Sequence, residues 1–239
     1  MSKLSGKIAI VSGGSGSLGR VVVEHLLSEG VVVITTMSDN KSSLDFLREK
    51  QKQHQSIEGF VVDVTSESSA KKFYTEVLSK HPSVDILCNL VGGVCPKKFI
   101  EDLSLAEWNS MINLNLNSCF LMIRESISSM KKNRFGRIIN IAAMPGIIPE
   151  AKRGGYGVSK AGVIALTKTV AEEIKDLENI TINAIAPSII LTEENKKWGT
   201  IEEIKKWVTP EQIANMILYL CSENGRAMNG QIIQMYGRL

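Results

Sequence analysis

The sequence predicts an α/β fold in which a doubly wound parallel sheet of about seven strands carries helices on both faces. Three observations predict it. Short apolar runs alternate with amphipathic stretches, a glycine-rich turn follows the first run, and no linker or repeat divides the chain. Strict alternation of strands and helices implies parallel strands joined by right-handed crossovers. We therefore expect one domain that spans residues 1–239.

The apolar runs are rich in β-branched residues and have the length of buried strands. They lie at residues 7–11, 31–36, 57–62, 84–90, 136–142, 180–185 and 231–235. The stretches between them carry apolar residues at helical spacing. These predict helices at residues 17–29, 41–53, 66–79, 104–131, 156–177 and 210–222. The segment between the sixth strand and about residue 200 is expected to be irregular.

Composition narrows the class of protein. Hydrophobic residues make up 44% of the chain and charged residues 22%, which is typical of a globular protein with a full core. A net charge of +3 is too small to indicate a nucleic-acid or membrane partner. No apolar run approaches the roughly 18 residues of a membrane span, and the polar start of the chain is not a signal peptide.

The four cysteines are widely spread and form no C-x-x-C pair: Cys88, Cys95, Cys119 and Cys221. Free thiols in a reducing compartment are expected rather than disulfides or a zinc site. The three histidines lie near no carboxylate or cysteine cluster, so we expect no metal. The sequence thus predicts a cytoplasmic protein whose partner is a small molecule.

The turn after the first strand has the composition of a phosphate-binding loop. Gly14-x-Gly16-x-x-Gly19 matches the dinucleotide fingerprint, and it stands between a strand and an amphipathic helix. Glycines let the backbone turn tightly and approach a pyrophosphate, which the positive N-terminus of the next helix attracts. The loop therefore predicts a Rossmann-type dinucleotide site.

A second motif, Tyr156-Gly-Val-Ser-Lys160, opens the helix after the central strand. Four residues make about one helical turn, so the two side chains project from one face. An ammonium near a phenol lowers the phenol pKa from about 10, and such a tyrosine can exchange a proton with a carbonyl oxygen during redox chemistry. The alternative is that this spacing arises by chance on an ordinary helix.

In this order and at these spacings, the motifs resemble the short-chain dehydrogenases/reductases over nearly all of the chain. Gly13 and Gly19 fit the family's glycine loop, whereas Ser17 stands where the family has its middle glycine. The run 89–92 resembles the family's N-N-A-G, and the run 187–192 its P-G-x-x-x-T.

The resemblance implies a nicotinamide cofactor and a set of residues that bind it. These are Gly13, Ser15, Gly16, Ser17, Leu18, Gly19, Ser38, Asp63, Val64, Asn89, Val91, Gly92, Tyr156, Lys160, Pro187, Ile190 and Thr192. Within this set, Asp63 would lie beside the adenine, and the 187–192 run would clamp the nicotinamide carboxamide. A purely structural role is the alternative for single members, such as a helix cap at Asp63.

The resemblance also implies hydride transfer from the nicotinamide to a carbonyl. Tyr156 would protonate the product oxygen, and Lys160 would bond the ribose hydroxyls and lower the Tyr156 pKa. Asn115 matches the asparagine that breaks the family's long helix and holds a water near the catalytic lysine; a buried structural amide is the alternative.

One position departs from the family. Thirteen residues before the tyrosine the family has a serine that orients the substrate carbonyl and donates a hydrogen bond to it; here the residue is Ala143. Losing one such donor typically costs about 10²–10³ in rate. Some relatives, dihydropteridine reductases among them, resemble this chain in lacking the serine and reduce quinonoid substrates. The loop 152–155 is expected to be solvated, although it could bring a cationic donor.

The expected function is therefore reduction of a carbonyl or of a conjugated quinonoid or pterin-like acceptor. Among the family's activities, 3-oxoacyl carrier-protein reduction is one that this chain resembles. The alternative is a non-catalytic nucleotide-binding homologue that acts as a sensor or partner.

Cofactor choice rests on the end of the second strand. The position of an NAD-selecting carboxylate is occupied by Met37, and Asp39 follows two residues later. The glycine loop has no arginine for a 2′-phosphate, and Ser38 and Lys41 are the nearby candidates. On balance we expect NADP(H) rather than NAD(H).

Assembly is predicted from the stretches 104–131 and 156–177, which carry more apolar residues than one buried face requires. Examples are Ile112, Leu116, Phe120 and Ile123. Such a surplus is typical of a homodimer or homotetramer, and a wide core face is the alternative.

Overall fold

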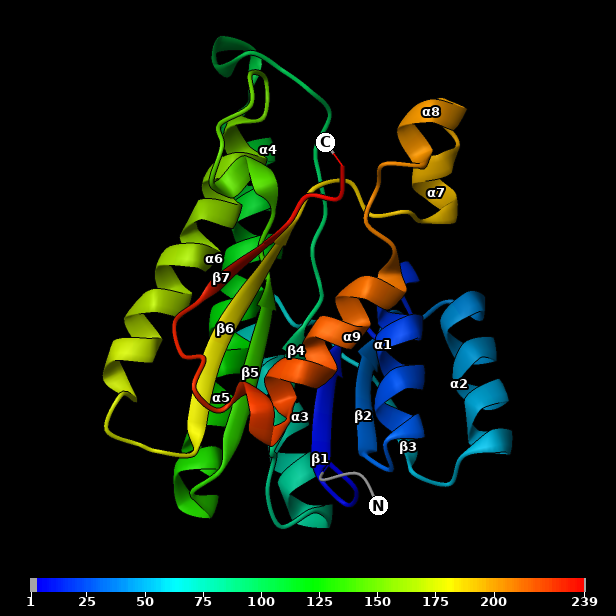
Figure 1. The fold of residues 1–239 in the computed structure, drawn as a ribbon, viewed down its shortest axis with the longest axis vertical. Coiled ribbons are helices and arrows are strands. Elements are labelled where there is room, and N and C mark those ends of the chain that lie inside the picture. Colours follow the sequence, from blue (N-terminus) through cyan, green and yellow to red (C-terminus); the bar gives the residue numbers. More distant parts are fainter. Residues whose placement is uncertain (1–3, 239) are drawn as a thin grey trace.

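The computed structural model describes residues 4–238; the first three residues of the polar start and the last residue lie outside the described part. Seven strands form one parallel sheet, as predicted (Figure 1). They are β1 (Ile8–Ser12), β2 (Val32–Met37), β3 (Ile57–Val61), β4 (Ile86–Asn89), β5 (Gly136–Ile141), β6 (Ile180–Pro187) and β7 (Ile232–Met235). Their order is β3-β2-β1-β4-β5-β6-β7, so the winding reverses between β1 and β4. Ligands of such sheets bind outside the carboxyl ends of the strands at this reversal.

Helices cover both faces of the sheet (Figure 1). One face carries α1 (Ser17–Ser28), α2 (Lys41–Gln53) and α9 (Pro210–Cys221), and the other carries α3 (Glu67–Lys80), α5 (Ser118–Asn133) and α6 (Gly154–Glu173). Successive side chains of a strand point to opposite faces, so Ile10 packs in one core cluster and Val11 in the other. Between residues 4 and 238, no helix is both long and apolar enough to cross a membrane.

The predicted helix at 104–131 is not continuous. It consists of α4 (Leu105–Ile112), a π-helical segment (Asn113–Asn117) and α5. A π-helical turn contains one residue more than an α-helical turn. Such segments are frequent at functional sites. The break expected at Asn115 is thus confirmed, and it lies inside the π-helical segment.

The segment expected to be irregular contains two short helices, α7 (Glu193–Lys196) and α8 (Ile201–Ile204). Each is only four residues long, which is too short to produce a helical periodicity in the sequence. Their start signals were nevertheless present: Thr192 caps α7, and Thr200 forms a capping box with Glu203 at α8. Both helices lie above the carboxyl ends of the strands (Figure 1).

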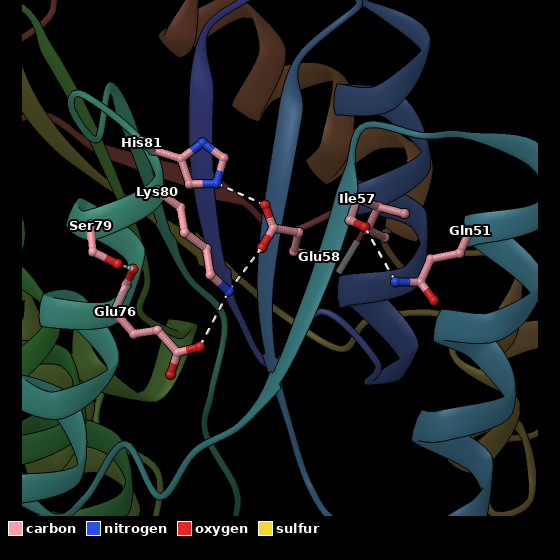
Figure 2. A network of polar contacts seen from close by, with 7 residues as sticks. All are labelled: Gln51, Ile57, Glu58, Glu76, Ser79, Lys80 and His81. Atoms are coloured by element: carbon pink, nitrogen blue, oxygen red, sulfur yellow. Dashed lines mark hydrogen bonds and ion pairs between the residues drawn. The ribbon is translucent and has the colours of Figure 1, made fainter.

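Polar contacts hold the edge strand β3 to its neighbouring helices (Figure 2). His81, which ends α3, lies with Nε2 2.8 Å from the Glu58 carboxylate, and Lys80 Nζ lies 3.7 Å from the same carboxylate. On the other side, Gln51 of α2 donates to the main-chain carbonyl of Ile57 at 3.5 Å. These groups are partly exposed, so each pair contributes at most about 1 kcal/mol to stability.

Candidate active site

The glycine loop has the geometry that a dinucleotide requires. Gly13 has a φ of +74°, in the left-handed region, and a side chain at Gly19 would collide with the Gly13 carbonyl oxygen. The loop ends at Gly16, and no described side chain caps the helix α1 that follows, whereas Asn40 caps α2. The first N–H groups of α1 therefore remain available to an anion such as the cofactor pyrophosphate.

A cavity of about 720 Å³ lies against this loop, at the carboxyl ends of β1, β2 and β4. Eight of the predicted cofactor residues line it: Gly13, Ser15, Gly16, Ser38, Asp63, Val64, Val91 and Gly92. The cavity volume lies within the range of ligand and cofactor sites. The structure thus brings residues from four separate segments of the chain to one cavity, and its glycines and hydroxyl-bearing residues are suited to phosphate and ribose groups.

Several residues of this cavity were not predicted from the sequence. They lie at the ends of β2 and β3, directly after β2, β3 and β4, or in the π-helical segment: Thr36, Asn40, Ser42, Ser43, Val61, Val62, Thr65, Leu90 and Leu114. Ser43 Oγ lies 2.8 Å from Ser15 Oγ, so the start of α2 is tied to the glycine loop. Their position directly after parallel strands was the available signal, because the carboxyl ends of such strands meet at one edge.

The other predicted cofactor residues do not line this cavity. Ser17, Leu18 and Gly19 begin α1. Asn89 is buried at the end of β4 and donates to Asn140 Oδ1 at 2.9 Å.

Of the run that ends β6, Pro187 is the last residue of the strand, and the Ile190 carbonyl accepts a hydrogen bond from Asn195 Nδ2 at 2.9 Å. The Thr192 hydroxyl accepts from Asn195 N–H at 3.2 Å. In this conformation the run supports α7, and its contact with a nicotinamide stays a prediction.

Asp63 forms a tight turn rather than a helix cap. Its Oδ1 accepts hydrogen bonds from Thr65 N–H at 2.9 Å and from the Thr65 hydroxyl at 2.6 Å, and the residue that caps α3 is Ser66. Because Asp63 also lines the cavity, the expected place beside an adenine remains open to it.

Asn115 connects three elements of the site. Its Oδ1 accepts a hydrogen bond from Gly93 N–H at 2.9 Å, and its Nδ2 donates to the Gly93 carbonyl at 3.0 Å and to Ser159 Oγ at 3.1 Å. The Ser159 hydroxyl in turn donates to the Tyr156 carbonyl at 2.7 Å. The π-helical segment, the loop after β4 and the first turn of α6 are thereby joined. Ser159 was not predicted, although it stands inside the Tyr-x-x-x-Lys motif.

Lys160 is only 4% exposed, and its Nζ donates a hydrogen bond to the Ile141 carbonyl at 2.7 Å. Burial lowers the pKa of this amine from 10.5 to about 8. Gly92 packs directly over the amine, since a Cβ there would lie 3.1 Å from Nζ. The end of β5 and the loop after β4 therefore fix the position of the lysine.

The electrostatics of Tyr156 correct two expectations. Burial raises the pKa of its phenol to about 12, Arg153 acts to lower this pKa and Glu150 to raise it. Among the charged groups of the described residues, Arg153 and Glu150 rather than Lys160 act on this pKa, and the Lys160 amine donates to the Ile141 carbonyl. The loop before α6 is also not simply solvated: the Arg153 side chain is only 22% exposed.

Residue 143, which the resemblance aligns with the family serine, contributes only a methyl group here. Ala143 is buried at the end of β5 and begins the 3-10 turn Met144–Gly146.

Comparison with known proteins agrees with this geometry. The family model described as short chain dehydrogenase matches residues 7–203. The chain belongs to this family.

Among its relatives in the short-chain dehydrogenase family, the 3-oxoacyl-[acyl-carrier-protein] reductase of Aquifex aeolicus is 32% identical, and the alignment covers 98% of both chains. The protein of the same name from Thermotoga maritima is 30% identical over 99% of both chains. Two solved structures cover 98% of this chain. One, described as a 3-oxoacyl-reductase from Bacillus thuringiensis, is 30% identical with a TM-score of 0.86 and is itself covered to 98%. The other, described as a gluconate dehydrogenase from Agrobacterium tumefaciens, is 29% identical with a TM-score of 0.90 and is covered to 96%. The chain is accordingly an NAD(P)-dependent oxidoreductase.

Proposed function

We propose that the protein reduces a carbonyl group with NADPH, and that Tyr156 donates the proton to the carbonyl oxygen. The observation that carries this proposal is the geometry at the start of α6: Asn115 holds Ser159, which is bonded to the Tyr156 carbonyl, and the Lys160 amine is fixed by the Ile141 carbonyl one turn after Tyr156. The bound nicotinamide supplies the hydride. The names of the relatives make a 3-oxoacyl thioester the first substrate class to test.

Lys160 and Asn115 support this chemistry in different ways. The Lys160 amine lies at the inner end of the site and would bond the ribose hydroxyls of the nicotinamide half. Asn115 holds the Gly93 backbone and Ser159, and so keeps the turn that carries Tyr156 in place. It would also support a water on the path by which Tyr156 regains its proton.

The proposed preference for NADP(H) rests on the cavity wall after β2. Hydroxyl groups of Ser15, Ser38, Ser42 and Ser43 line it, and the positive N-terminal end of α2 lies there. Asp39 lines the same wall and would favour NAD(H) by binding ribose hydroxyls. Titration with both reduced cofactors decides between them: a tighter binding of NADPH supports the proposal, and a tenfold or larger preference for NADH contradicts it and implicates Asp39.

The activity is tested by single-turnover oxidation of bound NADPH with ketones, diketones, an acetoacetyl thioester, quinones and pterins. We expect turnover with a carbonyl substrate and its loss in Tyr156→Phe, with cofactor binding unchanged. Binding of NADPH without oxidation by any member of the panel would favour the alternative function, a nucleotide-binding sensor or partner.

A quinonoid or pterin-like acceptor is the second candidate, and Ala143 is the observation that favours it. Such acceptors are already electrophilic and need less polarisation by a hydrogen-bond donor. Tyr156→Phe would then slow the reaction without abolishing it, because solvent can protonate the product.

The proposed setting of this activity is a cytoplasmic homo-oligomer. All four cysteines are free, which is usual for proteins of reducing compartments. Large apolar side chains are exposed on the layer formed by α4, α5 and α6, among them Leu105, Phe120 and Val158. A second copy of the chain would cover such a surface and give a dimer or tetramer.

A further inference from the structure

The end of β5 leaves the substrate carbonyl with one hydrogen-bond donor fewer than the family provides. Ala143 offers a methyl group, and Pro145 in the following turn has no N–H. The next two amides are already bonded within the turn, from Gly146 to the Ala143 carbonyl at 2.9 Å and from Ile147 to the Met144 carbonyl at 2.9 Å. The side chain of residue 143 and the amides of residues 145–147 thus offer no donor to a substrate beside Tyr156, and a group from another segment can take over its orientation.

Arg153 is placed to be that group. It immediately precedes α6 and stands three residues before Tyr156. Its positive charge acts to lower the pKa of the Tyr156 phenol. Its Nη1 donates to the Cys95 carbonyl at 3.2 Å, which ties the guanidinium to the loop after β4. Its Nη2 makes no hydrogen bond to any described residue. One edge of the guanidinium is thus fixed by the protein, and the other edge is free.

The charge of Arg153 is only partly neutralised. The nearest carboxylate is that of Glu150, whose Oε2 lies 3.8 Å from Arg153 Nε, beyond hydrogen-bond distance. Glu150 instead forms its close contact with Lys97, at 2.6 Å. A half-buried guanidinium with a free edge, whose counter-ion makes no hydrogen bond to it, can bind a carboxylate, because its planar fork matches the two carboxylate oxygens.

The loop that carries Arg153 is also held in place. Lys98 N–H donates to the Lys152 carbonyl at 3.1 Å, and the Lys152 ammonium lies 4.3 Å from the centre of the Phe99 ring. The segments 95–99 and 150–153 therefore hold each other, and Arg153 does not need to be ordered when a ligand arrives. Such preorganisation lowers the free-energy cost of binding.

We propose that Arg153 binds a carboxylate of the substrate beside Tyr156, so that the preferred substrates are oxo acids. This inference rests on the proposed carbonyl reduction. Fixing the carboxylate orients the carbonyl toward the Tyr156 hydroxyl and replaces the orienting role of the missing serine. The carbonyl carbon gains a hydride, with its two electrons, from the reduced nicotinamide, and the oxygen gains a proton from Tyr156. The product is a hydroxy acid, the cofactor is left oxidised, and the carboxylate is unchanged.

Matched pairs of acid and ester test this specificity. The NADPH-loaded enzyme is assayed with acetoacetate and ethyl acetoacetate, and with pyruvate and methyl pyruvate. We expect a higher kcat/KM for each acid, and a loss of about 10- to 100-fold on the acids in Arg153→Gln with little change on the esters. We expect the Arg153→Lys variant to retain part of the preference for acids over esters. An exposed cation farther along α6 provides the control, because Lys168→Gln leaves the ratio of acid to ester unchanged.

Inhibition gives a second readout that does not depend on turnover of an acid. Malonate should inhibit reduction of the esters by the wild-type enzyme, and its inhibition constant should rise by about tenfold or more in Arg153→Gln. Equal loss on acids and esters, or a wild-type enzyme that prefers the esters, overturns the role of Arg153 and leaves carbonyl reduction standing. Failure of the wild-type enzyme to reduce any acid or ester, despite bound NADPH, overturns both proposals.

Discussion

Ala143 is the single residue that most affects the expected rate. Its side chain is buried beside the turn that faces α6, and its extended backbone, with φ −164° and ψ 159°, is open to any residue. We expect Ala143→Ser to raise kcat/KM for a simple ketone by about tenfold or more, because the new hydroxyl can stabilise the charge that develops on oxygen. A quinone or pterin should gain little. Steady-state kinetics with both substrate classes measures this, and no gain on any ketone would mean that another donor already acts there.

The buried Lys160 amine, which is proposed to bind the cofactor ribose, lowers the stability of the folded protein at neutral pH. Its pKa is about 8 in the folded protein against 10.5 ordinarily, so below pH 8 a charged amine is buried at a cost. Between pH 8 and 10.5 the unfolded chain binds more protons than the folded one, and stability rises with pH. The difference between the two pKa values corresponds to a free energy of unfolding that is lower by roughly 3 kcal/mol below pH 8.

We therefore expect Lys160→Met to stabilise the cofactor-free protein at pH 7 by about 1–3 kcal/mol, less whatever is lost with the bond to the Ile141 carbonyl. The gain in stability between pH 8 and 10 should disappear in this variant. Urea denaturation at pH 7 and pH 10 measures both effects, with the exposed Lys168→Met on the same helix as the control. A variant that keeps the wild-type pH dependence would show that Lys160 is not the group responsible.

At the scale of elements, the π-helical segment is the joint that assembles the site. Asn115→Ala removes two bonds to the Gly93 backbone and one to Ser159. Buried groups left without partners cost about 1–3 kcal/mol each, so we expect a loss of about 2–4 kcal/mol in stability together with a large loss of activity. Asn117→Ala, in the same segment but exposed, should change neither by much. Thermal denaturation and NADPH oxidation measure the two effects, and equal effects of both variants would contradict this role.

The positions of the strands and helices were predicted from the sequence far better than the charge environment of the site residues. All seven strands lie within a residue or two of the predicted ranges, because parallel strands buried on both faces leave continuous apolar runs. The two short helices α7 and α8 were not predicted, because four residues are too few to show a helical periodicity of apolar side chains. The pKa of Tyr156 and the position of Arg153 could not be predicted either. Both depend on where long side chains come to rest in the packed structure, and the Tyr-x-x-x-Lys spacing carries no information about that.

At the scale of the whole molecule, the sheet order explains why residues from distant parts of the chain form one site. The reversal between β1 and β4 opens a crevice at the carboxyl ends, and the glycine loop, the start of α2 and the loops after β3 and β4 all reach it (Figure 1). Tyr156 and Lys160 arrive from the other side of the reversal, on α6 after β5. The loop after β4 lies between the two groups, because Gly92 lines the cavity and also packs over the Lys160 amine.

The layer of α4, α5 and α6 carries the last prediction, which concerns assembly. The predicted apolar surplus is only partly on the surface: Ile123 belongs to the core and Leu116 packs against it, whereas Phe120 is 43% exposed. Leu105 and Val158 of the neighbouring helices are exposed as well. We expect the wild-type protein to have two or four times the 26.2 kDa mass of one chain.

A charge on this layer should break the contact, because an unpaired carboxylate buried between two copies has a large desolvation cost. We expect Phe120→Glu combined with Val158→Glu to lower the mass toward 26.2 kDa in light scattering at micromolar concentration. The same charge at Ile201, which is 75% exposed on α8, provides the control and should leave the mass unchanged. A wild-type protein that is already monomeric would contradict the prediction. If the double variant keeps the wild-type mass, the interface lies on another surface of the molecule.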